Sequence, residues 1–283
     1  MIPAQFDYVR ASSVDEAVAA LAEHGDEAKV MAGGQSLIPL LRLRLSYPEV
    51  VVDVGRVAEM AGVREDGAHL VIGAMTTHHE VIHNELIRRH CGLIAEATET
   101  VADPAVRHRG TFGGALAHAD PAGDLPAVAL ALDAEMVIAG SGGRRTVPAE
   151  EFFLDYLQTA VQPDEVLVEV RVPKLGEGWG YRYEKFHRVA QSWAIVGVAA
   201  AVRRSNGTIA EARVGLTNMG STPVRASGVE EALNGASLER IGEAADRAAE
   251  GTSAPSDLNG KADYREHLAR VLTRRAVTAA AGS

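Results

Sequence analysis

The sequence predicts an α+β protein of two domains, divided near residue 176. In the first part, short apolar strands alternate with amphipathic helices, a pattern of α/β character. In the second part, Asn206-Gly207 separates two apolar runs, which is the strongest short signal of a β-hairpin. Alanine-rich helical patterns follow near 226–250 and 261–280. We therefore expect a small antiparallel sheet followed by helices in the second domain.

The first elements are recognised by their caps and apolar runs. A helix is expected to begin at Ser13, which fits a capping box with Glu16, and to stop at Gly25. Three apolar strands follow it, and the first of these runs into a double glycine. The strands are predicted over residues 28–32, 49–55 and 68–75.

The stretch 76–90 predicts one helix, with Thr77 as its N-cap. Inside it, His79, Glu80 and His83 match the H-E-x-x-H pattern, in which two histidines on one helix face bind zinc and the glutamate acts as a base. The alternative is that Glu80 is a first-turn capping residue between ordinary helix histidines. Because short motifs match by chance, we favour the cap and predict no metal site.

Strands and helices continue to alternate up to the hairpin. The glycine-rich stretch 109–132 is expected to end as a helix. Strands are predicted over 134–140 and over 165–173, where a proline closes the second. The two hairpin strands are expected within 192–204 and 208–218.

Composition excludes several classes of function. The chain has 283 residues, 47% of them hydrophobic, and a net charge of −10, so it can bury a large core and carries no basic stripe for nucleic acid. It has no apolar run of about 18 residues to span a bilayer, and its start lacks a signal-peptide pattern. We expect a cytoplasmic protein. The single cysteine, Cys91, excludes an internal disulfide or an iron–sulfur cluster held by this chain alone.

Two glycine-rich segments are candidate ligand loops. In the segment 32–36, AGGQS, successive backbone N–H groups after a strand can form an anion nest, to which Ser36 adds a hydroxyl. The segment 111–124 adds a second double glycine and two aspartates. Each alone is equally well explained as a turn, with Asp124 capping the next helix, and neither matches a dinucleotide or Walker fingerprint. Together they favour a phosphate-containing cofactor.

No side chains form a recognisable catalytic set. The serines lack a nucleophile-elbow context, and the ten histidines are scattered. We therefore predict no catalytic residue in this chain, and expect any chemistry to belong to a bound cofactor.

Three stretches carry a family resemblance: AGGQSLIPLL, TFGGALAHADPAGDLPA and YEKFHRVAQSWAIVGVAAAV. In this order and spacing they resemble the FAD-binding medium subunit of the molybdenum hydroxylases, the xanthine dehydrogenase and carbon monoxide dehydrogenase group. The likeness covers essentially the whole chain. Four more stretches are most similar to the aerobic carbon monoxide dehydrogenase branch, namely MIPAQFDY, VIGAMTTHHEVI, GLTNMGSTP and APSDLNGKADYR.

The resemblance implies a fold and a set of site residues. The fold is a PCMH or vanillyl-alcohol-oxidase-like FAD-binding domain, 1–176, of two α+β subdomains, about 1–57 and 58–176. A C-terminal domain, 177–283, follows as a three-stranded antiparallel sheet with helices. The first glycine loop is expected to hold the FAD pyrophosphate through its amides. The implied cofactor-binding residues are Ala32, Gly33, Gly34, Gln35, Ser36, Thr111, Gly113, Gly114, Asp124, Leu167, Lys185 and Trp193.

Four positions depart from the family pattern. Gln35 stands where a histidine is frequent, and both can donate a hydrogen bond. Phe112 replaces a small aliphatic residue, which changes the expected packing under the flavin. Trp193 replaces a tyrosine near the isoalloxazine and can still stack on the ring or shield it. Ser192 replaces an aspartate, so the charge at that position is lost.

The resemblance also implies a role in electron relay. A molybdenum–pterin large subunit oxidises the substrate, and a small subunit with two 2Fe–2S clusters passes the electrons to this FAD. The external acceptor is then a quinone or another respiratory carrier. The expected assembly is a dimer of three-subunit units, with membrane association, if any, peripheral and through the whole complex.

Several alternatives stay open at this point. The substrate is selected on another subunit, so carbon monoxide, a purine, an aldehyde and an aromatic acyl-CoA all fit. A stand-alone flavin oxidoreductase and a scaffold that has lost FAD are the other interpretations.

Overall fold

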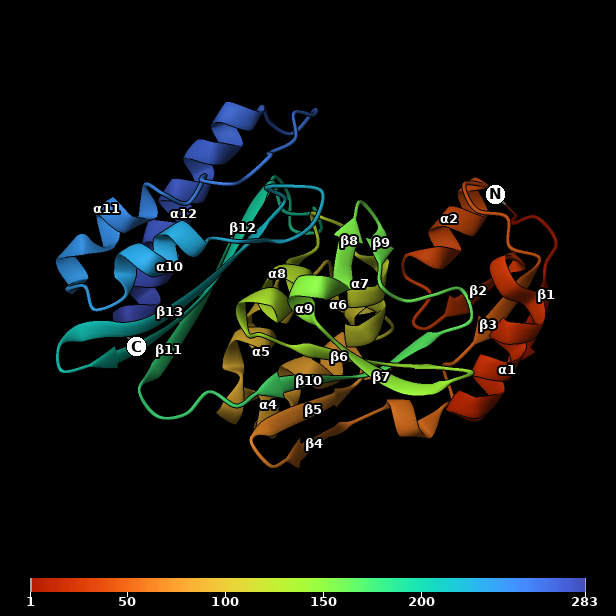
Figure 1. Ribbon diagram of the computed structural model, residues 1–283. Helices are drawn as coiled ribbons and strands as arrows, with labels where there is room; N and C mark the ends of the chain where they lie inside the picture. The colour runs from red at the N-terminus through yellow and green to blue at the C-terminus, as the bar shows by residue number, and fades with distance from the viewer. Residues whose placement is uncertain (1, 283) are drawn as a thin grey trace.

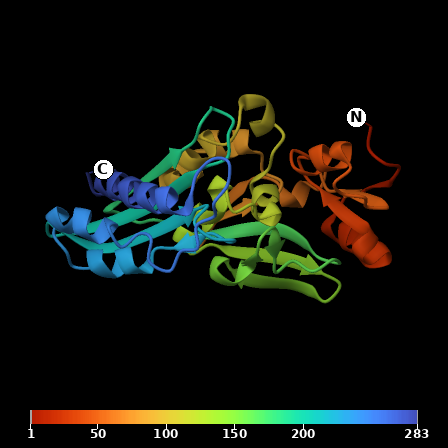
Figure 2. The ribbon, with the colours of Figure 1, turned by 90° about the horizontal axis from the view of Figure 1, so that it is seen from above.

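The computed structural model describes residues 2–282 as three units in a row. A small three-stranded sheet lies at the N-terminal end, a five-stranded sheet in the middle and a four-stranded sheet at the C-terminal end (Figure 1). The view from above shows the same succession, with the first and last units at opposite ends (Figure 2). The mixture of helices with separate sheets confirms the α+β class.

The N-terminal unit is a parallel sheet in the order β1-β3-β2. Its strands and helices are β1 (Asp7–Arg10), α1 (Val14–His24), β2 (Ala28–Met31), α2 (Leu37–Leu43) and β3 (Val50–Asp53). Ser13 caps α1 by accepting a bond from the Glu16 amide, as predicted. The Glu16 carboxylate accepts bonds from the amide and hydroxyl of Ser12, and not from the amide of Ser13 as a capping box requires. The predicted capping box is therefore formed only in its first half.

The middle unit is an antiparallel sheet in the order β4-β5-β10-β6-β7, with helices against it. Its strands are β4 (Val63–Asp66), β5 (His69–Gly73), β6 (Glu135–Gly140), β7 (Gly143–Pro148), β10 (Val166–Pro173) and the separate pair β8 (Phe153–Asp155) and β9 (Gln158–Thr159). Its helices are α3 (His78–His83), α4 (Glu85–His90), α5 (Gly92–Glu99), α6 (Pro104–Arg107), α7 (Phe112–His118), α8 (Asp124–Ala131) and α9 (Ala149–Phe152).

The C-terminal unit is an antiparallel sheet in the order β11-β12-β13-β14. Its elements are β11 (Trp179–Phe186), β12 (Val196–Ser205), β13 (Thr208–Thr217), β14 (Val224–Arg225), α10 (Ser227–Leu233), α11 (Ile241–Ala245) and α12 (Ala262–Gly282). Asn206 and Gly207 both have positive φ, as a type I′ hairpin requires. The two-residue strand β14 is a fourth strand that the three-stranded expectation did not include, because it pairs only with the end of β13.

Strand β12 joins two hydrophobic cores because its side chains alternate between the two faces of the sheet. Ala199 and Ala201 belong to the core of the middle unit, while Val198, Ala200 and Val202 belong to the core under α12. Close packing continues on β13, where a Cβ at Gly215 would lie 2.2 Å from the Ala127 carbonyl oxygen of α8. The C-terminal sheet is thereby seated on α8, the helix that begins at Asp124.

The single helix predicted over 76–90 is wrong, because two short helices meet there at Asn84. The Asn84 side chain accepts bonds from the amides of Leu86 and Ile87 and so caps α4. In α3, the Glu80 carboxylate accepts bonds from the amide and hydroxyl of Thr77, which completes a capping box. The H-E-x-x-H match is therefore a helix start. No group of three or more metal-ligating side chains occurs within residues 2–282.

The capping box gives a first testable prediction. Thr77→Ala removes the acceptor for the Glu80 amide and should lower the free energy of unfolding by ~1 kcal/mol. Urea unfolding of the variant and the parent measures this change. Thr208→Ala is the control, because its hydroxyl donates only to a hairpin carbonyl, and it should cost less. An unchanged stability in Thr77→Ala would contradict the capping role.

No helix within residues 2–282 combines the length and the hydropathy needed to cross a bilayer.

Candidate functional site

A cleft lies where the N-terminal unit meets the middle unit. It consists of three adjoining hollows of about 450, 280 and 100 Å³, here called the first, second and third hollow. The first and second share Gln35, Ser36, Ala115 and His118. The first and third share six residues, namely Val30, Ala32, Gly114, Ala117, Val161 and Glu165. The three hollows therefore form one continuous cleft.

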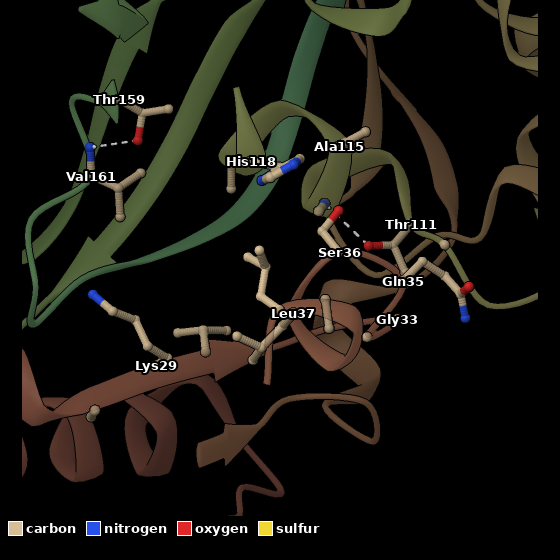
Figure 3. Close-up of a pocket in the computed structure, with 18 of the residues that line it drawn as sticks. Lys29, Gly33, Gln35, Ser36, Leu37, Thr111, Ala115, His118, Thr159 and Val161 are labelled. Carbon is tan, nitrogen blue, oxygen red and sulfur yellow. Dashed lines mark hydrogen bonds between the residues drawn. The ribbon is translucent and has the colours of Figure 1, made fainter. Parts of the chain in front are cut away.

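Every residue predicted to bind the cofactor lines this cleft. The first hollow is lined by Ala32, Gly33, Gly34, Gln35, Ser36, Thr111 and Gly114. The second hollow adds Asp124, Lys185 and Trp193, and the third adds Gly113 and Leu167. Figure 3 shows the first hollow, with Lys29 and Leu37 below it, Thr159, Val161 and His118 above it, and Thr111 on the same side of the view as Gln35 and Ser36.

The first glycine loop presents a row of free backbone donors to the first hollow. The amides of residues 33–37, between β2 and α2, make no hydrogen bond to any residue that the structure describes. All five residues line the first hollow. Gly34 has a φ of +74°, a conformation that L-residues seldom adopt. Consecutive free N–H groups at a helix start are suited to an anionic group such as a phosphate.

Gly33 has a second role that the sequence did not indicate. A Cβ at Gly33 would lie 1.9 Å from the carbonyl oxygen of Arg109 and 3.0 Å from the Cα of Gly110. The double glycine therefore brings the first loop directly against the backbone that leads into the second loop. Because Gly33 has no side chain, the two walls of the cleft can pack against each other at this point.

The second glycine loop contributes little free backbone. The amides of Phe112 and Gly113 donate to the carbonyls of Thr76 and Ala74. The Gly114 amide donates to the Thr111 hydroxyl oxygen at 3.1 Å (Figure 3). Gly113 packs against Ala74, since a Cβ added at Gly113 would lie 2.4 Å from the Cβ of Ala74. Gly114 faces the cleft. What this loop offers a ligand is space beside Gly114 and the hydroxyl of Thr111.

A buried ion pair forms one wall of the second hollow. The Lys185 ammonium lies 2.7 Å from Asp124 Oδ2, and both side chains are 3% exposed. The Tyr183 hydroxyl donates to Asp124 Oδ1 at 2.7 Å, and Lys185 also donates to the Thr100 carbonyl. Each carboxylate oxygen keeps one lone pair, and the ammonium keeps one N–H, for a ligand.

Burial governs the protonation of this wall. It raises the pKa of Asp124, and the nearby Lys185 opposes that rise without cancelling it. Burial, reinforced by the charge of Asp124, raises the pKa of Tyr183 well above its ordinary value. Tyr183 is therefore a neutral donor at physiological pH.

The four departures from the family pattern fall in different surroundings. Gln35 lines the first and second hollows, and Ser192 and Trp193 line the second. Trp193 is 54% exposed, with its ring 6.5 Å from that of His118. Phe112 is buried in the hydrophobic core and lines none of the three hollows, so its larger ring is accommodated by the core.

Two residues were missed from the sequence: Tyr183, which is buried behind the cleft wall and bonds to Asp124, and His118, which lines the cleft. Tyr183 lies two residues before Lys185 on β11, on the same face of the strand, and this period-2 spacing was the available signal. His118 ends α7 and lines both larger hollows, but nothing in its sequence context distinguished it from the other histidines.

Comparison with known proteins finds two family profiles on the chain. The profile described as "FAD binding domain in molybdopterin dehydrogenase" matches residues 4–175. The profile described as "CO dehydrogenase flavoprotein C-terminal domain" matches residues 181–280.

Similar proteins match almost end to end. The chain is 42% identical to the carbon monoxide dehydrogenase medium chain of Hydrogenophaga pseudoflava, over 99% of this chain and 98% of that protein. It is 40% identical to the medium chain from Afipia carboxidovorans, over 98% and 97%. A solved structure of the Hydrogenophaga pseudoflava enzyme, in a form that lacks the Mo-pyranopterin moiety, matches with a TM-score of 0.96 and 44% identity over 99% and 98% of the two chains.

Proposed function

This chain belongs to the family of FAD-binding medium subunits of the molybdenum hydroxylases, and on that premise we propose that it is the electron-transfer subunit of a carbon monoxide dehydrogenase-type enzyme. The protein is an FAD-containing oxidoreductase subunit. The observation that carries the finer proposal is the cleft, in which five free amides face the same space as a buried ion pair.

The residues of the cleft fit FAD. In our proposal the amides of 33–36 and the hydroxyl of Ser36 hold the pyrophosphate, and Ala32, Thr111, Gly113 and Gly114 shape the space around it. Asp124, Leu167, Lys185 and Trp193 then surround the rest of the cofactor. Bound FAD would supply two-electron redox chemistry that can also proceed in single-electron steps.

The chain's own side chains set the conditions of the site. Asp124 neutralises Lys185, so the wall has no net charge in the absence of a ligand. Two of the ammonium N–H groups are held by Asp124 and by the Thr100 carbonyl, and this fixes the direction of the third. Tyr183 fixes the other oxygen of Asp124. Trp193 lines the second hollow, where its ring can shield part of the cofactor from water.

We divide the chain by function at residue 176, with residues 1–57 and 58–176 as the two halves of the FAD-binding domain. The separate sheets of the N-terminal and middle units support this division. Residues 177–283 form the C-terminal domain, which supplies Lys185 and Trp193 to the cleft.

The relatives are medium chains of multi-subunit enzymes. For this protein we propose an iron–sulfur small subunit as electron donor, a molybdenum–pterin large subunit for substrate oxidation, and a dimer of such trimers. The only cysteine, Cys91, is buried, which agrees with cluster ligands on another chain. We propose a quinone as the acceptor and the cytoplasm as the location.

Purification from source cells through a tag on this chain tests the proposal. We expect a yellow complex with one FAD per copy of the chain, containing molybdenum and iron, whose flavin absorbance is bleached by carbon monoxide. The chain produced alone should bind FAD but show no bleaching. A chain that cannot bind FAD, or one that oxidises substrate without partners, would overturn the proposal.

A further inference from the structure

A short segment between β9 and β10 lines the first hollow but not the second. The segment 159–165, here called the strap, contributes Thr159, Val161, Gln162, Pro163 and Glu165 to the lining of the first hollow. We propose that Arg145 and Glu165 position the strap to hold the adenosine half of FAD, with Glu165 facing the purine and Arg145 acting only through Glu165 and the strap. This inference rests on the proposed function, because it needs FAD in the cleft.

A guanidinium fixes the orientation of the Glu165 carboxylate. Arg145 Nε donates to Oε1 at 2.8 Å and Nη2 donates to Oε2 at 2.6 Å, an arrangement of two parallel bonds that adds directional specificity to the charge attraction. The Gln162 amide also donates to Oε2, so only Oε1 keeps a lone pair that no described residue uses. The hydrogen bonds from Arg145 lower the pKa of Glu165, and the carboxylate therefore stays ionised at neutral pH.

Arg145 also holds the strap directly. Its Nη2 donates to the Ala160 carbonyl at 2.6 Å, and Gln162 Nε2 donates to the same oxygen. On β6, a Cβ at Gly140 would lie 2.9 Å from Cγ of Glu165, so the glycine leaves room for this side chain. Arg145 itself lines none of the three hollows. The shape of this wall is therefore determined by a residue outside the cleft.

The first glycine loop divides the cleft at the place proposed for the pyrophosphate. Gln35 and Ser36 line both the first and the second hollow, whereas Gly33 and Gly34 line only the first. The pyrophosphate is in the middle of FAD, between the flavin half and the adenosine half. One half can therefore enter the second hollow, and the other can enter the strap end of the first hollow, which continues into the third.

The polar groups at the two ends indicate which half each one takes. The isoalloxazine has carbonyl acceptors, and the second hollow offers the free N–H of Lys185. Adenine has an amino group that donates, and the strap end offers the free lone pair of Glu165 Oε1. The third hollow is the smallest, and Glu165 is the only charged residue among those described in its lining. It suits a two-ring purine better than a three-ring flavin.

Lys29 places a cation opposite the strap. It lies across the first hollow from Thr159 and Val161 (Figure 3), and it makes no ion pair with any residue within 2–282. Arg145 already neutralises Glu165, so the charge of Lys29 remains available to a phosphate. The strap end therefore combines an acceptor for an amino group with a cation for a phosphate, as a nucleotide requires.

Two neighbouring arginines on β7 provide matched variants. Arg145→Gln releases Glu165 and the Ala160 carbonyl, and it should weaken the binding of FAD and of ADP by the same factor, about tenfold. Arg144→Gln breaks only a surface ion pair with Glu59, on the other face of the strand, and should change neither affinity. Full-length apoprotein is titrated with FAD, displacement of FAD measures the affinity for ADP, and circular dichroism reports the fold.

Two further variants separate positioning from general damage. Trp193→Ala alters the flavin end alone, so it should weaken FAD binding and leave ADP binding unchanged. Arg145→Lys keeps the charge but cannot bond to Glu165 at two points and to Ala160 as well, so it should recover only part of the affinity that Arg145→Gln loses.

Four outcomes would overturn the proposal. These are unchanged FAD affinity in Arg145→Gln, a loss for FAD that ADP does not share, complete recovery in Arg145→Lys, and a parent protein from which ADP cannot displace FAD. A parent protein that does not bind FAD at all would instead refute the proposed function itself.

Discussion

Gly33→Ala is expected to weaken FAD binding about 100-fold. The new Cβ would lie 1.9 Å from the Arg109 carbonyl oxygen, a backbone atom that cannot rotate away, so the two loops must separate. The free amides of residues 33–37 then move relative to the opposite wall. Losing two bonds from backbone donors to a charged phosphate, at ~1.5 kcal/mol each, corresponds to about this factor in affinity.

Graded controls separate this effect from general damage. Gly34→Ala meets the flexible end of Ile38 at 2.6 Å and has a positive φ, so we expect a smaller loss, about tenfold. Gly176→Ala places its Cβ in open space and should not alter FAD affinity. Titration of the apoprotein with FAD gives the affinities, and circular dichroism reports the fold. A folded Gly33→Ala protein with parental affinity would contradict the assignment.

The local elements could be predicted because their signals are local. Asn206-Gly207 and the flanking apolar runs determine the hairpin, and Ser13 determines the start of α1. The interruption of the helix at Asn84 was missed because the apolar periodicity continues through it. The sheet order was beyond sequence reasoning, since β10 pairs with both β5 and β6, from which it is remote in the chain.

The site residues were predicted through family motifs, but the reasons for them were only partly foreseen. The sequence indicated that the glycines let the backbone approach a ligand. The structure adds that Gly33 approaches the backbone at Arg109, and Gly113 approaches Ala74. Such contacts join segments far apart in sequence, so no local pattern encodes them. Tyr183 was missed for the same reason, since its importance comes from Asp124 on another element.

Lys185→Met is expected to lower the free energy of unfolding by ~3–5 kcal/mol at neutral pH. It leaves the carboxylate of Asp124 buried beside Tyr183 without its counter-charge. The variant should also bind FAD less well, because the ammonium faces the second hollow. Urea unfolding and FAD titration measure the two effects. Lys174→Met is the control: its ion pair with Glu65 is at the surface and is worth ~0–1 kcal/mol.

The double variant Asp124→Asn/Lys185→Met distinguishes a buried charge from lost packing. Asparagine keeps the shape of the aspartate and can still accept the bond from Tyr183, but it carries no charge. We therefore expect the double variant to be more stable than Lys185→Met alone, even though it has two substitutions. A double variant as unstable as Lys185→Met would mean that packing, rather than charge, accounts for the loss.

The pH dependence provides a separate test of the same pair. Burial already raises the pKa of Asp124, and removal of Lys185 takes away the largest opposing influence, so the pKa of this carboxyl rises further in Lys185→Met. The folded variant then holds the proton more tightly than the unfolded chain does. Its stability is highest below the unfolded pKa of the carboxyl and falls as pH rises toward the folded pKa.

The difference in free energy of unfolding between Lys185→Met and the parent should therefore become smaller as the pH is lowered from neutral. Asp124→Asn/Lys185→Met has no carboxyl to titrate at this position, so it should lack this component of the pH dependence. A difference that stays constant with pH would show that Asp124 is not the charge that Lys185 compensates.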